Sequence, residues 1–214
     1  MTLESYINEW RQQLGIKFWQ EDAFNAVIPR LLAGEDSVEL ADAAAALFFA
    51  LSDEDGSRAR LTWLCCDGLP ECPLAQGKVL QDAWTTGKVG SILAGFLKTD
   101  VMRWFESASK MTLMTEAERA ALAALPDIVT AYRGGAGVTS RKLAAGISWT
   151  LDPDRASFFA TKYLFRAAGP PVVVRADFPK GAILAYLDAR NEREIVVNWR
   201  RARGVTAVAP PDSV

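Results

Sequence analysis

The sequence changes character at Leu125-Pro126, and this change limits the folds that are open to the chain. Before it, apolar residues recur at helical spacing between polar turns; after it, short strand-like runs alternate with loops and turns. Helices followed by strands are typical of an α+β protein. We therefore predict a helical region over residues 1–125 and a sheet-forming domain over residues 126–214. No Gly-, Ser- or Pro-rich linker separates them, so we expect them to pack as one body.

The helical region divides at its turns and capping residues. Asp36-Ser37 is a capping signal, Thr115 with Glu118 has capping-box spacing, and Pro29 must bend or end the helix that contains it. The run 58–66 is apolar enough for a helix or a strand, and we favour a helix. The other expected helices cover roughly residues 2–14, 18–32, 38–51, 79–86, 89–108 and 116–125.

The second region contains strand-like runs, one helix and loops. A helix over 155–165 is expected after an N-cap at Asp152 or Asp154. Gly134 to Gly137 is expected to form a loop, since glycines permit a turn and a close approach of a ligand. The expected strands are 128–132, which leads into Arg133, and then 148–150, 172–178, 183–186, 192–197 and 205–208.

Polar side chains interrupt three of these apolar strands. Arg133 ends the first strand, and Ser148 and Thr150 share one face of the second, while Trp149 points to the other face. Glu192 and Glu194 share a face just before Ile195. If the strands are neighbours, these residues form a polar cluster on an otherwise apolar sheet.

This order of motifs resembles the NAD-dependent ADP-ribosyltransferase family of the arginine–serine–glutamate class. The matching pieces are Tyr132-Arg133-Gly134, Ser148-Trp149-Thr150 with Phe158-Phe159-Ala160, and Glu192-Arg193-Glu194, within roughly residues 125–208. Trp149 departs from the commonest spelling of the serine motif, whereas Thr150 keeps a hydroxyl. The resemblance implies a split β-sheet fold, NAD as substrate and no metal.

The resemblance also implies roles for individual residues. Glu194 would contact the ribose and stabilise the cation, Glu192 would activate the acceptor, and Ser148 would orient the catalytic glutamate and help to hold the ligand. The turn with Tyr186, Asp188 and Arg190 corresponds to a loop that recognises targets. The residues expected at NAD are Arg133 at its diphosphate, Gly134, Ser148, Trp149, Thr150, and Phe158 or Phe159 at the nicotinamide, with the other phenylalanine in the core.

Each of these residues also has a purely structural interpretation. Arg133 could form a surface ion pair at a strand end, and Ser148 could be a strand hydroxyl bonded within the fold. Glu192 and Glu194 could be charges that protect an exposed edge strand from pairing. The basic run 199–203 is expected to be a solvated turn.

Composition excludes several other classes of function. The chain of 214 residues has no histidine, which excludes Ser-His-Asp and Cys-His catalysis, His-rich metal sites and the histidine class of ADP-ribosyltransferases. The net charge of −2 argues against coating nucleic acid or a membrane surface. Cys65, Cys66 and Cys72 fit neither a complete zinc site nor a disulfide framework, so we expect reduced thiols. With no signal peptide or membrane span visible, a cytoplasmic protein is expected.

We therefore predict a mono-ADP-ribosyltransferase that transfers ADP-ribose from NAD to a macromolecular acceptor. A protein acceptor is favoured and a nucleic acid is not excluded; compact enzymes of this kind resemble bacterial or phage-borne effectors. Two alternatives stay open: an NAD glycohydrolase with water as acceptor, and a fold relative without catalysis that works as a binding module. The role of residues 1–125 is open.

Overall fold

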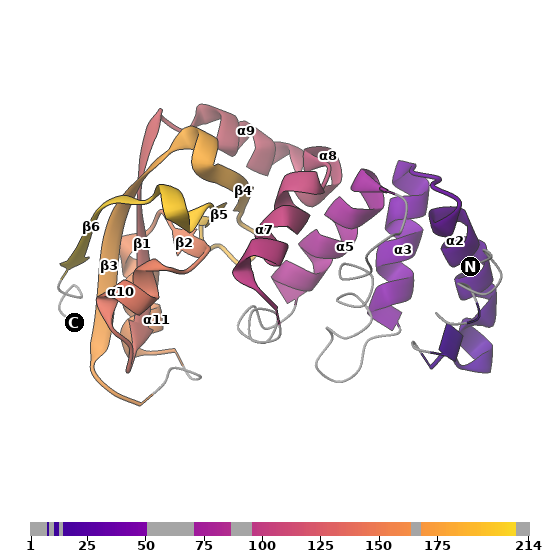
Figure 1. Cartoon of the computed structure of the whole chain (residues 1–214), viewed down its shortest axis with the longest axis horizontal. Helices are drawn as coiled ribbons and strands as arrows, with labels where there is room; N and C mark the ends of the chain where they lie inside the picture. The colour runs from indigo at the N-terminus through magenta and orange to yellow at the C-terminus, as the bar shows by residue number, and fades with distance from the viewer. Residues whose placement is uncertain are drawn as a thin grey trace. The chain divides into compact units, whose positions relative to one another are not determined.

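The computed structural model describes residues 8, 11–12, 15–50, 71–86, 96–163 and 168–208, and divides the chain into two compact units, Met1–Thr115 and Glu116–Val214 (Figure 1). The helices expected at 2–14 and 58–66 lie mainly outside the described residues. The boundary falls between Thr115 and Glu116 rather than at Leu125-Pro126. The reason is that helix α9 (Glu116–Ala124) packs on strand β4 (Ile183–Leu187) of the second unit.

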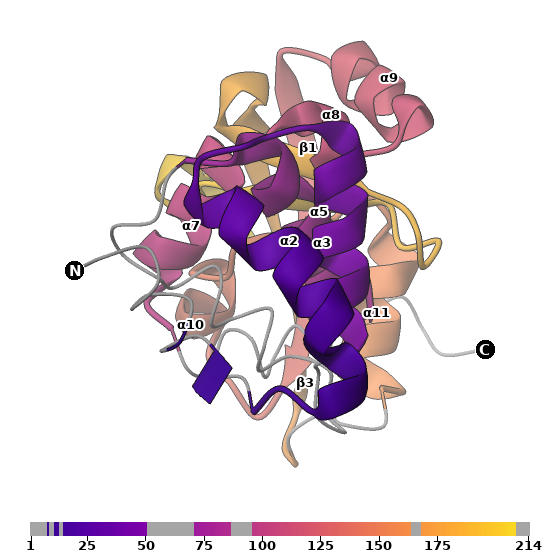
Figure 2. The same ribbon diagram turned by 90° about the vertical axis from the view of Figure 1, so that its right-hand side faces the viewer.

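The first unit is helical in its described residues. A short 3₁₀ turn, η1 (Phe18–Gln20), leads into α2 (Glu21–Leu32), which continues through Pro29, and α2 lies against α3 (Val38–Ala50) (Figure 2). The predicted Ser37 cap is confirmed, since its Oγ accepts from the Leu40 amide at 3.2 Å. The remaining helices are α5 (Pro73–Thr86), α7 (Lys98–Ser107) and α8 (Lys110–Leu113).

Helix α5 begins at Pro73, earlier than the predicted residue 79. Asp36, predicted to cap α3, instead accepts hydrogen bonds from the amides of Leu74 and Ala75 in the first turn of α5. Proline fits this first turn because the missing N–H has no partner within a helix. Packing of the unit is then completed by large buried side chains, among them Phe24, Ile28, Leu31, Phe48, Trp84 and Phe105.

The described residues of the second unit form a six-stranded antiparallel sheet in the order β4-β5-β2-β1-β3-β6. With the helices of the first unit, this sheet confirms the predicted α+β class, and β1, β2 and β5 are neighbours within the sheet. Helices α10 and α11 pack on β1 and β3. Besides β4 and α9, the elements are β1 (Ile128–Ala136), α10 (Ser140–Ala144), β2 (Ser148–Thr150), α11 (Pro153–Thr161), β3 (Pro171–Pro179), η2 (Lys180–Ala182), β5 (Glu194–Val197), η3 (Trp199–Arg201) and β6 (Arg203–Val208).

The expected loop at Gly134–Gly137 is wrong, because β1 continues to Ala136. Gly134 and Gly135 pair with Val173 and Val172 of β3. A Cβ at Gly134 would lie 1.7 Å from the carbonyl oxygen of Ala156 in α11. Glycine is therefore required at this position because α11 packs closely on β1, and not because the chain turns here.

The expected strand 192–197 is two residues too long at its start. Asn191 and Arg193 have positive φ angles of 54° and 45°, which no strand residue adopts. Consequently β5 begins at Glu194, and Glu192 belongs to the turn before it.

Candidate active site

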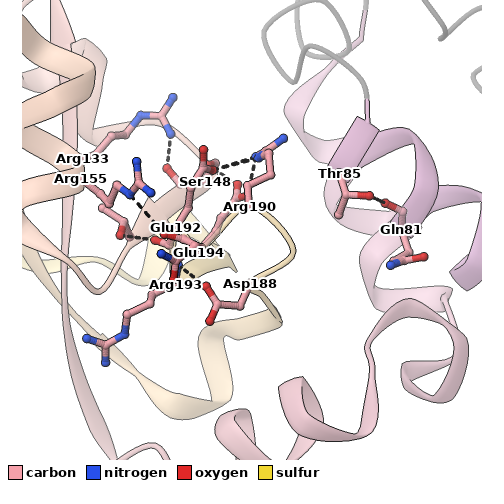
Figure 3. Close-up of polar contacts among 12 residues, drawn as sticks. Gln81, Thr85, Arg133, Ser148, Arg155, Asp188, Arg190, Glu192, Arg193 and Glu194 are labelled. Carbon is pink, nitrogen blue, oxygen red and sulfur yellow. Dashed lines mark hydrogen bonds and ion pairs between the residues drawn. The ribbon is translucent and has the colours of Figure 1, made fainter. Parts of the chain in front are cut away.

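Three of the predicted site residues lie on neighbouring strands of the second unit: Arg133 on β1, Ser148 on β2 and Glu194 on β5 (Figure 3). Ser148 is opposite Val196 in the register of β2 and β5, so Glu194 is its diagonal neighbour on the same face. The Ser148 hydroxyl donates a 2.5 Å hydrogen bond to Glu194 Oε1. Position on the sheet alone therefore brings this serine and this glutamate together.

Arg133 joins the pair through the backbone of the serine. Its Nη1 donates to the Ser148 carbonyl oxygen, and its side chain passes over Gly146, where a Cβ would lie 2.4 Å from Nε. Nε is buried and has no hydrogen-bond partner among the described residues. Burial lowers the pKa of the Arg133 guanidinium, and the Glu194 carboxylate opposes that change. The site thus holds a half-buried cation near the buried carboxylate of Glu194.

Arg190 contacts both glutamates of the Glu-Arg-Glu motif. Its Nη2 lies 3.0 Å from Glu194 Oε2 and 3.0 Å from Glu192 Oε2, and its Nε donates to Glu192 Oε2 at 3.1 Å. The Glu194 side chain is 6% exposed, against 18% for Glu192 and 34% for Arg190. Sequence reasoning placed Arg190 in a target-recognition turn and missed this pairing, which depends on the fold of the turn.

Thr150 holds the turn that carries Glu192. Its hydroxyl donates to the Glu192 carbonyl oxygen at 2.6 Å and accepts from the Asp152 amide at 3.0 Å. Arg155 Nε donates to the Asn191 carbonyl oxygen of the same turn at 3.2 Å. Since these bonds are internal to the fold, the structure favours a positioning role for Thr150 over contact with a ligand.

Asp188 and Glu118 anchor the other side of this turn. Asp188 Oδ1 accepts from the Arg193 amide at 2.8 Å, and the Asp188 amide donates to Glu118 Oε1 at 2.6 Å. Glu118 is buried and comes from α9. The capping-box spacing draws attention to Glu118 as a helix-capping residue. No pattern in the sequence predicts its hydrogen bond with the amide of Asp188, which is 70 positions further along the chain.

Trp149 and Gly134 lie within the packing of the unit. The Trp149 side chain is 1% exposed, packs edge-on against Phe178 and donates its ring N–H to the Gly146 carbonyl oxygen at 2.8 Å. Gly134 lies beneath Ala156 of α11. We therefore assign Trp149 and Gly134 to the fold and remove them from the residues proposed to contact NAD.

Phe158 and Phe159 of α11 form a ring cluster with Tyr163. Phe159 is 5.7 Å from Phe158 and 5.1 Å from Tyr163 between ring centroids. The expectation that one phenylalanine belongs to the core is wrong: Phe158 is exposed and Phe159 is half-buried. Because Gly134 lets α11 come so close to the sheet, the helix buries Ala156, Ser157 and Ala160 instead.

The predicted N-cap of α11 is confirmed at Asp152, whose Oδ1 accepts from the amides of Asp154 and Arg155. Cys72 is a free, buried thiol in the first unit, while Cys65 and Cys66 lie outside the described residues. Burial, with a smaller effect of Asp36, raises the pKa of Cys72 to about 11.

Two kinds of feature are absent from the described part of the chain. None of its helices combines the length and apolar character needed to cross a membrane. Nor do its Cys, Asp and Glu side chains gather in groups of three or more that could hold a metal ion. In comparisons with known proteins, no family model, no curated protein and no solved structure matches this chain.

Proposed function

We propose that this chain is a mono-ADP-ribosyltransferase, which cleaves NAD and transfers ADP-ribose to a macromolecular acceptor, a protein, in the cytoplasm. The observation that carries the proposal is the hydrogen bond from Ser148 to Glu194, with Arg133 bonded to the backbone of the same serine. These residues come from three strands that are neighbours in the sheet, and they follow one another along the sequence in the order of the family's motifs.

Glu194 is suited to stabilise positive charge. Cleavage of the bond between nicotinamide and ribose passes through an oxocarbenium-like centre, as glycoside cleavage does. A carboxylate stabilises such a centre best when it is fixed in place and shielded from water. Glu194 meets both conditions, since it is buried, its Oε1 accepts from Ser148 and its Oε2 accepts from Arg190.

The other residues supply charge, proton transfer and stacking. Arg133 provides a cation beside Ser148 that suits the diphosphate of NAD, because guanidinium groups pair well with phosphate oxygens. Glu192, more exposed than Glu194, takes a proton from the attacking group of the acceptor. Phe158 is the more exposed of the two phenylalanines and is proposed to stack on the nicotinamide.

The proposal is tested with labelled NAD and a cell lysate, with Glu194→Gln beside the wild type. Gln keeps the shape of the side chain and removes its charge, so label on a discrete protein band should be lost. Glu116→Gln is the matched control, because Glu116 is an exposed glutamate of the same unit. Free nicotinamide without labelled protein would replace the proposal by the glycohydrolase, and an absence of turnover would favour a binding module.

A further inference from the structure

The two glutamates of the Glu-Arg-Glu motif are held in place by different parts of the fold. Glu194 is paired with Thr150 of β2 and with Leu187 of β4 in the register of the sheet. Glu192 lies outside the strand, in the turn that joins β4 to β5, and Arg190 Nε of the same turn donates to its carboxylate. A shift of the turn therefore moves Glu192 and leaves the backbone pairing of Glu194 intact.

The turn has a backbone conformation that needs support from its surroundings. Asn191 and Arg193 have positive φ angles of 54° and 45°, and neither residue is a glycine. Such a conformation persists where neighbouring groups hold it. Asp188 supplies part of this support, because its carbonyl oxygen accepts from the Asn191 amide and its Oδ1 accepts from the Arg193 amide, each at 2.8 Å. The position of Asp188 thus sets the position of the turn.

Asp188 is itself held from outside the turn, by Glu118 of α9. The Asp188 amide donates to Glu118 Oε1 at 2.6 Å, and Glu118 is 7% exposed. A hydrogen bond to a carboxylate is shorter and stronger than one between neutral groups, and burial strengthens it further. Helix α9 also packs on β4, the strand that leads into the turn. Glu118 is therefore an anchor for the β4 side of the turn, while Thr150 holds its β5 side.

The other end of α9 has a separate attachment. Lys180 Nζ donates to the Ala123 carbonyl oxygen at 2.5 Å. Lys180 belongs to η2, which precedes β4, whereas the turn with Glu192 follows β4. The two attachments therefore make it possible to separate the docking of α9 on the unit from the placement of the turn.

We infer that Glu118 is a positioning residue that directs ADP-ribose to the macromolecular acceptor instead of to water. The inference rests on the proposed function, in which Glu194 stabilises the ribose cation and Glu192 takes a proton from the acceptor. While Glu118 holds the turn, Glu192 is in place to deprotonate the attacking group. When that contact is lost, Glu194 still supports the cleavage of NAD, and water, which is present in large excess, captures the ribose.

Both products follow from one cleavage step. The bond between C1′ of the ribose and the nicotinamide nitrogen breaks, and neutral nicotinamide leaves with the electron pair. In transfer, an acceptor atom forms the new bond to C1′ and its proton passes to Glu192. In hydrolysis, the oxygen of water forms that bond, its proton passes to the solvent, and free ADP-ribose is released. The ratio of the two products therefore reports the placement of Glu192 and does not depend on the amount of folded enzyme.

The test measures this ratio with labelled NAD and a cell lysate, after subtraction of the lysate alone. Glu118→Ala removes the acceptor for the Asp188 amide, and we expect the ratio of labelled protein to free ADP-ribose to fall about tenfold, the size of effect expected for losing a hydrogen bond to a charged group. Glu118→Gln keeps an acceptor oxygen without the charge, so its ratio should fall by less, about threefold. Lys180→Met is the matched control: it loosens the other end of α9 and should keep the wild-type ratio.

Hydrogen exchange gives a second readout that needs no NAD. The peptide that contains the Asp188 amide should exchange about tenfold faster in Glu118→Ala than in the wild type, and at the wild-type rate in Lys180→Met. Unchanged exchange of this peptide in Glu118→Ala would show that Glu118 does not hold the turn.

The outcomes separate the inference from the proposed function. An unchanged product ratio in Glu118→Ala would overturn the inference and leave the proposed function standing, even if the total rate falls. An equal fall in Lys180→Met would also overturn the inference, since loosening of α9 would then be sufficient. If Glu118→Ala does not fold, the ratio in Glu118→Gln decides in the same way. A wild type that labels no protein would overturn the proposed function, and the inference with it.

Discussion

Replacing Gly134 by alanine tests whether the close contact between β1 and α11 holds the second unit together. The new Cβ would lie 1.7 Å from the Ala156 carbonyl oxygen and 3.1 Å from the Ala160 nitrogen, and ordinary contact begins at 3.4 Å. The obstacle is helix backbone, so no side-chain rotation can relieve the clash, and α11 must retreat by the difference, 3.4 − 1.7, or 1.7 Å. Ala156 and Ala160, both buried, would lose their contact with Val173.

Overpacking a core costs about 1–3 kcal/mol when side chains can adjust. Since backbone must move here, we expect a loss of about 3 kcal/mol in the free energy of opening, which is about 100-fold faster hydrogen exchange. The assay is hydrogen-exchange mass spectrometry on peptides from β1 and α11. Gly181→Ala is the control, because no atom lies within 4 Å of its added Cβ. Equal exchange in the two variants would refute the argument from close packing.

Three further predictions concern single groups. Asp152→Ala removes the acceptor for two amides of the first turn of α11, and thermal unfolding should show a loss of about 1 kcal/mol, whereas an unchanged midpoint would contradict the cap. Thr150→Val leaves the Glu192 carbonyl oxygen without this donor, so we expect a loss of about 1–2 kcal/mol in urea unfolding and slower NAD cleavage; unaltered kinetics would remove Thr150 from the positioning of the turn. Cys72 has a folded pKa of about 11, above its usual 9.0, so its contribution to stability is complete below pH 9 and is lost as pH rises towards 11. Comparing urea midpoints over this range with those of Cys72→Ala measures that contribution, and identical pH profiles would show that it is absent.

Local patterns in the sequence were sufficient to predict most elements of the second unit. The strand at 148–150 and the Asp152 cap depend on side chains close together in sequence, and both are confirmed. The prediction of a loop at Gly134 is wrong because a glycine is needed there for the close packing of Ala156, a residue distant in the sequence. The sequence shows that a glycine can adopt backbone angles that suit a turn. It does not show which part of the fold will pack against the position where a side chain would otherwise lie.

The candidate site divides in the same way. Ser148 and Glu194 were expected to come together because their strands carry matching polar positions, and they share a hydrogen bond. The contact of Arg190 with both glutamates could not be predicted, since it follows from positive φ angles at Asn191 and Arg193 that the sequence does not signal. Neither residue is a glycine, and the turn depends on bonds from Asp188 and Thr150.

The most direct test of the central claim is the rate at which the protein releases nicotinamide from NAD when a cell lysate supplies the acceptor. We compare the wild type with Glu194→Gln and Glu116→Gln, after thermal unfolding has established that all three are folded. If the Glu194 carboxylate stabilises the ribose cation, Glu194→Gln should slow release by about 100-fold or more, while Glu116→Gln should match the wild type. Equal rates in the wild type and Glu194→Gln, or no release by the folded wild type, would contradict the account.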